Sequence, residues 1–223
     1  NLKEFFSLYM KNLKKTEGKG MICIPSGNHD MDRMAETLTP DQMKMAFTFL
    51  LTMPGAPFIY YGDEIGMRKI HNLPSKEGGY SRTGSRSPMQ WDDSKNAGFT
   101  TGTPWIRVNP NYREINAKQQ VGNPDSVFSY YKDLIRLRHE NEIIVYGDYE
   151  LLEPDNEELF IYTRTLGDEK LVVLCNFTDQ DVTIPASVMA QIPDDAPIMI
   201  SNYVGNMPAV LRPYEATVRQ IKK

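Results

Sequence analysis

Residues 21–30 read Met-Ile-Cys-Ile-Pro-Ser-Gly-Asn-His-Asp, and this stretch decides the fold. The apolar run at residues 21–24 is typical of a short buried strand. The polar residues Asn28, His29 and Asp30 follow it closely. Barrel enzymes present their catalytic residues in this way, at the carboxyl ends of buried strands. The stretch therefore predicts an α/β fold with functional residues at a strand end.

A helix and a second strand are expected next. Thr39 is a suitable N-cap, Pro40 suits the first helical position, and Gln42 completes a Thr-x-x-Gln capping box. The sequence Pro54-Gly55 stops this helix, and the apolar residues 58–61 predict the second strand. A strand, a helix and a strand in this order are typical of a parallel crossover unit.

The rest of the chain divides at Gly147. Residues 67–125 show little periodicity, and an aperiodic segment of this length in a compact domain is usually functional. A last helix is expected from about Ser126. After Gly147 the pattern changes to period two, and residues 159–166 and 171–177 predict a β-hairpin. We therefore expect one domain at residues 1–147 and an antiparallel β domain at residues 148–223.

Several motifs together resemble the α-amylase family, glycoside hydrolase family 13. The run Asn28-His29-Asp30, with Arg33 just beyond, resembles the family's fourth signature region at the end of barrel strand seven. Residues 58–67 resemble barrel strand eight and its exit, and residues 130–138 resemble helix eight. Three further runs, at residues 86–92, 96–99 and 104–112, resemble the oligo-1,6-glucosidase and α-glucosidase branch most closely. The resemblance implies the C-terminal part of a (β/α)8 TIM barrel, with strands 7 and 8 and their helices, followed by an antiparallel β-sandwich domain.

The resemblance also implies roles for individual residues. Asp30 matches the family's third catalytic carboxylate, which stabilises the transition state. His29 matches a histidine that contacts the sugar at the cleavage point, and Arg86 an arginine that lines the substrate pocket. Arg33 matches a substrate-binding arginine less closely, because Asp32 stands where the branch often has proline. Asn28 could orient the side chains of His29 and Asp30. A turn capped by Asn and Asp is the alternative interpretation of the same three residues.

A complete retaining site also needs a nucleophile and a general acid. Asp63 and Glu64 are adjacent, and adjacent strand residues point to opposite faces, so we assign both a structural role. The family's Arg-x-Asp nucleophile motif does not occur at Asp32-Arg33 or Ser81-Arg82. The expectation is a fragment of an enzyme that cleaves α-glucosidic bonds of gluco-oligosaccharides, inactive alone. The alternatives are a transglycosylase or isomerase of the trehalose synthase or sucrose isomerase type, and a non-catalytic amylase-like binding module.

Composition limits the partners. A net charge of −4 gives no reason to expect nucleic acid, and the longest apolar stretch is too broken for a membrane span.

No metal-ligand cluster is visible, and no cofactor is expected. Cys23 and Cys175 lack metal or redox spacing, which favours two buried free thiols in the cytoplasm. Trp91 and Trp105 could stack on sugars, but packing is their more frequent role. Two barrel strands cannot close a barrel, so the exposed edges could lead the fragment to dimerise or swap elements. The alternative is a fragment held together by packing between the β domain and the last helix.

Overall fold

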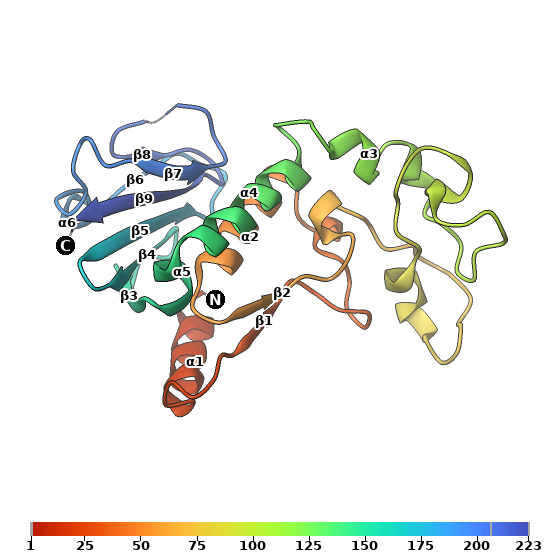
Figure 1. Cartoon of the computed structure of the whole chain (residues 1–223), viewed down its shortest axis with the longest axis horizontal. Coiled ribbons are helices and arrows are strands. Elements are labelled where there is room, and N and C mark those ends of the chain that lie inside the picture. The colour runs from red at the N-terminus through yellow and green to blue at the C-terminus, as the bar shows by residue number, and fades with distance from the viewer. Residues whose placement is uncertain (1, 206, 223) are drawn as a thin grey trace. The chain divides into compact units, whose positions relative to one another are not determined.

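A computed structural model describes residues 2–205 and 207–222 of the chain (Figure 1). The chain forms two compact units. The first, which we call the sheet unit, contains Asn1–Ile24, Lys44–Ala56 and Asp133–Lys223; the second, the loop unit, contains Pro25–Met43 and Pro57–Lys132. This division does not follow the boundary expected after residue 147, so that boundary stays a prediction.

The sheet unit is built on a five-stranded antiparallel sheet in the order β3-β4-β5-β9-β7. In Figure 1 its strands run from green to blue. The predicted hairpin is confirmed as β4 paired with β5 around Gly167, whose φ of 58° suits a tight turn. The strands are β3 (Asp148–Leu152), β4 (Leu159–Leu166), β5 (Glu169–Asn176), β7 (Ile198–Ser201) and β9 (Ala216–Lys222).

One face of this sheet carries an aliphatic core. This core includes Leu159 and Ile161 on β4 and Val172 and Leu174 on β5. The two residues of each strand are two positions apart, so their side chains point to the same face of the sheet. They pack with residues of β6 (Val182–Thr183), α6 (Ala186–Met189) and β8 (Val210–Leu211). Strands β6 and β8 pair with each other and form a second small sheet.

The opposite face of the sheet carries aromatic rings and a buried arginine. The ring centroid of Phe160 lies 4.5 Å from that of Phe6 on α1 (Leu2–Lys15) and 5.2 Å from that of Phe49 on α2 (Pro40–Thr52). Arg164 is fully buried and donates hydrogen bonds to the carbonyl oxygens of Thr52 and Gly147 at 2.8 and 2.6 Å. Because both faces are covered, strands β4 and β5 are almost entirely buried.

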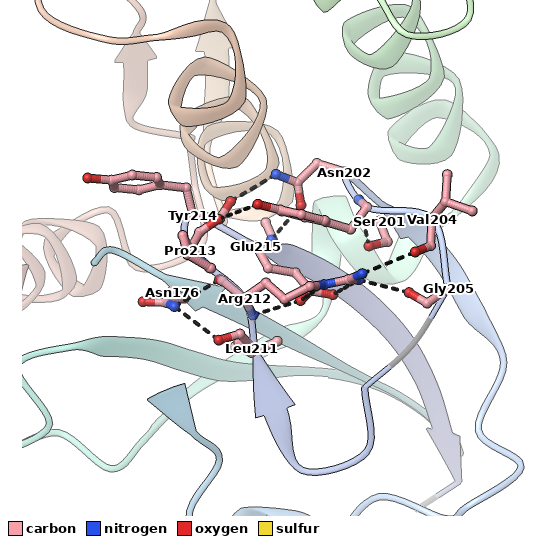
Figure 2. A network of polar contacts seen from close by, with 12 residues as sticks. Asn176, Ser201, Asn202, Val204, Gly205, Leu211, Arg212, Pro213, Tyr214 and Glu215 are labelled. Atoms are coloured by element: carbon pink, nitrogen blue, oxygen red, sulfur yellow. Dashed lines mark hydrogen bonds and ion pairs between the residues drawn. The ribbon is translucent and has the colours of Figure 1, made fainter. Parts of the chain in front are cut away.

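The loop that precedes β9 is fixed by a polar network (Figure 2). The Arg212 guanidinium pairs with Glu215 at 2.9 Å, donates to the carbonyl oxygen of Gly205 at 2.8 Å, and lies 4.2 Å from the ring centroid of Tyr203. Asn176, at the end of β5, donates to the carbonyl oxygen of Arg212 at 2.9 Å. The network therefore joins the loop to the sheet.

Two further helices and two short strands lie outside these two sheets. Helix α4 occupies Val127–Glu140 and α5 occupies Glu142–Tyr146. Strands β1 (Cys23–Pro25) and β2 (Ala56–Phe58) form a two-stranded sheet. The Ala56 amide donates to the Ile22 carbonyl and the Ser26 amide donates to the Phe58 carbonyl, so pairing advances in the same direction along both strands. This arrangement is parallel, as the sequence predicted.

Two expectations about these strands are wrong. Strand β2 begins and ends earlier than the predicted residues 58–61, because the chain turns beyond Phe58 into the 3₁₀ helix at Asp63–Ile65. Cys23 is exposed, whereas we expected both thiols to be buried. The side chains of β1 alternate, and Ile24 takes the inward position. Cys175 on β5 is buried as expected.

The predicted capping box of α2 is confirmed. The Thr39 amide donates to Gln42 Oε1 at 2.8 Å, and the Gln42 amide donates to Thr39 Oγ1 at 3.4 Å. Beyond β2 the loop unit contains α3 (Ala117–Gln120) and several short 3₁₀ helices; these lie at Met34–Glu36, Asp63–Ile65, Tyr80–Arg86, Lys95–Gly98 and Pro110–Arg113. None of the helices in the described ranges is both long and apolar enough to cross a bilayer.

Candidate functional site

Asp30 lies on an exposed turn of the loop unit just beyond β1. The Asp30 amide donates to Asn28 Oδ1 at 2.8 Å, so the side chain of Asn28 shapes the turn and orients Asp30. This bond is compatible with the orienting role that we predicted for Asn28, which stays a prediction, and it is also the capped turn of the alternative interpretation. Turn capping and site function are therefore compatible at this position.

Two arginines hold the Asp30 carboxylate. Arg86 Nη2 donates to Asp30 Oδ1 at 2.8 Å, and Arg82 Nη1 lies 2.9 Å from the same oxygen. His29 Nε2 lies 3.5 Å from Asp30 Oδ2, and the His29 carbonyl accepts from Arg86 Nε at 3.2 Å. The hydrogen bond from Arg86, with the charge of Arg82 in addition, holds the pKa of Asp30 below its ordinary value. The carboxylate is therefore ionised and accessible at neutral pH.

The structure brings together four of the five predicted site residues: Asn28, His29, Asp30 and Arg86. It adds Arg82, which was not among the predicted site residues and belongs to the run Ser81-Arg82 that does not fit the nucleophile motif. Both arginines lie on the 3₁₀ helix Tyr80–Arg86. No local pattern marks Arg82, because a spacing of four residues does not align two side chains on a 3₁₀ helix, which has three residues per turn.

Arg33, the fifth predicted residue, lies elsewhere in the loop unit. Its side chain is fully buried and donates to the carbonyl oxygens of Tyr61 and Ser85 at 2.6 and 3.0 Å. Its guanidinium carbon also lies 4.7 Å from the ring centroid of Tyr60. These contacts hold three segments of the loop unit together, and they leave the guanidinium inaccessible to a ligand in this structure. A substrate contact by Arg33 stays a prediction that its position does not favour.

Asp63 and Glu64 lie on the 3₁₀ helix Asp63–Ile65, so the strand placement that we assumed for them is wrong, and their surroundings differ. Asp63 is buried, accepts from Ser26 Oγ at 2.7 Å and lies 3.5 Å from Arg33 Nη1. These contacts fit the structural role that we assigned to it. Desolvation by burial raises the pKa of Asp63 despite the nearby guanidinium. Desolvation raises the pKa of Glu64 as well, and this side chain lines a pocket.

The pocket has a volume of about 390 Å³ and aromatic walls. Trp91 and Trp105 line it with 52% and 55% of their surfaces exposed, so neither is a core residue, and the loop-packing role that we favoured stays a prediction. Arg86 contacts both this pocket and Asp30. The residues that line the pocket are Tyr61, Glu64, Arg86, Ser87, Pro88, Met89, Trp91, Phe99 and Trp105.

The chemical capacity of this region follows from its groups. An ionised, accessible carboxylate can stabilise positive charge that develops on a bound molecule, and arginines fix its position beforehand. Aromatic walls with a few polar groups are typical of small-molecule sites. Within residues 2–205 and 207–222, no three metal-ligating side chains lie together as a cluster that could bind an ion.

Two known protein families together match nearly the whole chain. Residues 1–147 match the α-amylase catalytic domain, and residues 149–218 match the maltogenic amylase C-terminal domain. The order of the two matches, together with the antiparallel sheet, confirms the predicted architecture of a barrel-domain end followed by a β domain.

The chain spans less than half the length of the similar proteins that it matches. An oligo-1,6-glucosidase from Parageobacillus thermoglucosidasius is 39% identical over 94% of this chain and 44% of its own length. One from Bacillus cereus is 40% identical over 99% of this chain and 46% of its own length. That alignment extends over 264 positions, so at least 41 of them have no counterpart among the 223 residues here.

Solved structures are similar over the same range. The trehalose-6-phosphate hydrolase of Bacillus licheniformis matches with a TM-score of 0.84 and 30% identity, covering 100% of this chain and 47% of the hydrolase. The trehalulose synthase of Pseudomonas mesoacidophila matches with a TM-score of 0.83 and 31% identity, covering 99% of this chain and 47% of the synthase. With the match of residues 1–147 to the catalytic domain, these findings show that the chain belongs to the α-amylase family of glycoside hydrolases.

Proposed function

We propose that this chain provides the Asp30 side of the active site in an α-glucosidase that cleaves α-linked gluco-oligosaccharides with retention of configuration. The observation that carries the proposal is the exposed Asp30 carboxylate, which Arg82 and Arg86 hold at 2.9 and 2.8 Å. Membership of the α-amylase family supports this proposal. The similarity to proteins named oligo-1,6-glucosidases supports it as well.

The proposed role of Asp30 is electrostatic. Glycoside hydrolysis passes through an oxocarbenium-like transition state, and an ionised carboxylate beside the ring stabilises its positive charge. The lowered pKa of Asp30 keeps the carboxylate in the required form. His29 and Arg86 are proposed to contact sugar hydroxyls beside it.

The proposal assigns the nucleophile and the general acid to segments outside these 223 residues. The curated relatives are more than twice as long as the part that this chain matches, which leaves room for such segments. Asp63 is buried against Ser26 and Arg33, so it is poorly placed to attack a substrate. The chain alone is therefore expected to be inactive.

Two assays test these statements. The purified 223-residue chain should release no nitrophenol from a nitrophenyl α-glucoside, and measurable turnover would disprove its inactivity. In the longest protein that contains this chain, Asp30→Asn should lower kcat by about 10²- to 10³-fold, because one preorganised electrostatic group is lost. Asp93→Asn is the matched control, since Asp93 is also exposed and pairs with Lys118 at 3.0 Å. Equal activity of the Asp30 variant and the control would refute the role of Asp30.

An isomerase is the second candidate, favoured by the similarity to the trehalulose synthase structure. The trehalose-6-phosphate hydrolase and the trehalulose synthase both match this chain over almost its whole length and at about the same identity. Product analysis on isomaltose, maltose and sucrose separates them. Free glucose as the main product supports the hydrolase, whereas rearranged disaccharides support the isomerase.

Two further expectations belong to this proposal. A free, exposed Cys23 thiol is compatible with a reducing compartment, and we assign the protein to the cytoplasm.

Self-association of the chain is expected from the two-stranded sheet β1-β2, which leaves strand edges unpaired within the described ranges. A mass by light scattering tests the second expectation, and a monomer at all concentrations contradicts it.

A further inference from the structure

We propose that a second pocket of the loop unit binds a short peptide that has aliphatic side chains and free, charged termini. We call this pocket the aliphatic pocket. Its volume is about 360 Å³, and it shares no lining residue with the aromatic-walled pocket beside Arg86. The inference is independent of the proposed activity, because it concerns a different ligand and different residues.

The base of the aliphatic pocket is apolar. The buried side chains of Met43, Ile65 and Val127 form this base, and Leu38 lines the pocket as well. None of the described residues that line it is aromatic. The lining therefore offers apolar contact but no ring face on which a pyranose could stack. Branched aliphatic groups, such as the side chain of leucine, suit this surface.

Two opposite charges lie at the rim of the aliphatic pocket. Arg68 and Glu114 both line it, and both are exposed. Within the described ranges, neither of these side chains forms a hydrogen bond or an ion pair, with the other or with a third residue. A zwitterionic peptide can place its terminal carboxylate at Arg68 and its terminal ammonium at Glu114. Each terminus then gains a charge-assisted hydrogen bond.

Two amide side chains match the peptide group between the termini. Gln119 and Asn123 line the pocket. Gln119 Nε2 donates to the Arg113 carbonyl oxygen at 2.7 Å, and Asn123 Oδ1 accepts from the Asp125 amide at 3.0 Å. These bonds leave Gln119 Oε1 as an acceptor and Asn123 Nδ2 as a donor. A peptide group has one N–H and one C=O, so it can bond to both.

The walls of the aliphatic pocket are fixed by hydrogen bonds within the chain. Asn109 Nδ2 donates to the Arg68 carbonyl oxygen at 3.0 Å, which joins the wall of Arg68 to the 3₁₀ helix Pro110–Arg113. Gln120 Nε2, on α3, donates to the Ile65 carbonyl oxygen at 2.7 Å and so joins the base to that helix. A pre-formed pocket of this kind loses little conformational freedom when a ligand binds.

Other classes of ligand leave one feature of the pocket unmatched. An anion such as a fatty acid pairs with Arg68, but the carboxylate of Glu114 repels it. A saccharide carries no charge for either side chain and finds no aromatic ring. A molecule with an aliphatic body and both charges matches the base and the rim together.

Calorimetric titration tests the class of ligand. We expect the 223-residue chain to bind the dipeptide leucyl-leucine saturably, with a Kd of about 1 mM or below. Acetylation of the amino terminus and amidation of the carboxyl terminus should each raise the Kd about tenfold, because each removes one charged partner. The proposal is overturned if no saturable heat is observed, or if the free and the doubly capped dipeptide bind equally well.

Variants assign each terminus to its partner. In Glu114→Gln, acetylation of the dipeptide should no longer change the Kd, whereas amidation still should. In Arg68→Gln the reverse is expected. Glu77→Gln and Arg107→Gln are the matched controls, since both side chains are exposed and lie outside the pocket, and they should bind like the original chain. All four positions are exposed, so the variants should fold. Equal Kd values in the pocket variants and the controls overturn the proposal.

NMR spectra locate the bound peptide. The side-chain amide signals of Gln119 and Asn123 should shift with the Kd measured by calorimetry, whereas the indole signals of Trp91 and Trp105 should not. Indole shifts without amide shifts place the peptide in the other pocket and contradict the proposal. Isomaltose should leave the two amide signals unchanged, and a saturable shift with this sugar would overturn the assigned class of ligand.

Discussion

Asp30 and Arg86 are 56 positions apart in the sequence, and Arg86 Nη2 lies 2.8 Å from Asp30 Oδ1. This contact joins the turn after β1 to the last residue of the 3₁₀ helix Tyr80–Arg86. It fixes the direction of the carboxylate and favours its ionised form. The geometry of the site therefore depends on two segments that meet only in the folded chain.

The first prediction concerns the ionisation of Asp30. Arg86→Gln should raise the pKa of Asp30 towards its ordinary value, because the hydrogen bond from Arg86 is the main cause of the lowered pKa. A ¹³C NMR titration of the carboxyl group measures this shift. Arg136→Gln is the control, since Arg136 pairs with Asp133 elsewhere. An unchanged pKa in Arg86→Gln contradicts the assignment.

The sign of the accompanying stability effect follows from the same shift. A carboxyl group with a lowered folded-state pKa stabilises the fold above its unfolded-state pKa of about 3.9. This contribution is lost as the pH falls through the folded-state pKa. The stability difference between the original chain and Arg86→Gln should therefore shrink as the pH is lowered below about 4.

The second prediction concerns Gly84, which lies between Arg82 and Arg86. A Cβ atom at this position would overlap the Ile70 carbonyl oxygen and lie 2.7 Å from its carbon. Gly84→Ala should destabilise the chain by about 1–3 kcal/mol through overpacking and displace both arginines. Chemical denaturation measures the first effect, and a rise in the pKa of Asp30 reports the second.

Gly102→Ala is the matched control for Gly84. The nearest atom to a Cβ there is Thr100 Oγ1 at 3.7 Å, an ordinary contact. We expect this variant to leave both stability and the pKa of Asp30 almost unchanged. If the two alanine variants behave alike, the close approach of Gly84 to Ile70 does not hold the arginines in place.

The third prediction concerns the buried contact between Arg33 and Asp63. Arg33→Met leaves a buried carboxylate without its nearest cation and should lower the free energy of unfolding by about 3–5 kcal/mol. Arg136→Met removes an exposed pair and should cost about 1 kcal/mol or less. Urea denaturation measures both, and similar losses for the two variants would contradict the burial of Arg33.

The loss in Arg33→Met should also depend on pH. Burial raises the pKa of Asp63, and without Arg33 this pKa should rise further. A carboxyl group with a raised folded-state pKa favours the fold at low pH, and this contribution is lost as the pH rises through that pKa. The destabilisation should therefore be smaller at pH 4 than at pH 7.

The fourth prediction concerns the two thiols. Cys23 is exposed, whereas Cys175 is buried and its pKa is raised by desolvation. A thiol reagent should modify one cysteine in the folded chain and two in denaturant, because the reactive form is the thiolate. Mass spectrometry identifies the modified residue. Labelling of Cys175 in the folded chain would contradict its position on β5.

Local patterns made part of this structure predictable. The capping box of Thr39 and Gln42 depends on residues three apart, and the hairpin of β4 and β5 on the period of adjacent segments. The motif Asn28-His29-Asp30 could be recognised because its residues are contiguous. In each case the information that determines the structure lies within a short window of sequence.

Features that depend on distant segments were missed. Arg82 lies in an aperiodic stretch, and nothing in the spacing of Arg82 and Asp30 indicates that they form an ion pair. The burial of Arg33 depends on Tyr61 and Ser85, which approach it only through the tertiary fold. Cys23 lies in an apolar run that gives no indication of which side chains face inward. In β1 the side chains alternate between the two faces, and that of Cys23 is on the exposed face.

The strand order β3-β4-β5-β9-β7 has a consequence for biosynthesis. Strand β9 pairs with β5 on one side and with β7 on the other, yet it is the last strand in the sequence. During translation, β7 has no neighbour in this sheet until β9 leaves the ribosome. The hairpin of β4 and β5 can form early, whereas the complete sheet must assemble after synthesis of residues 216–222. Nascent chains halted before this point would expose the unpaired edge of β5 to chaperones.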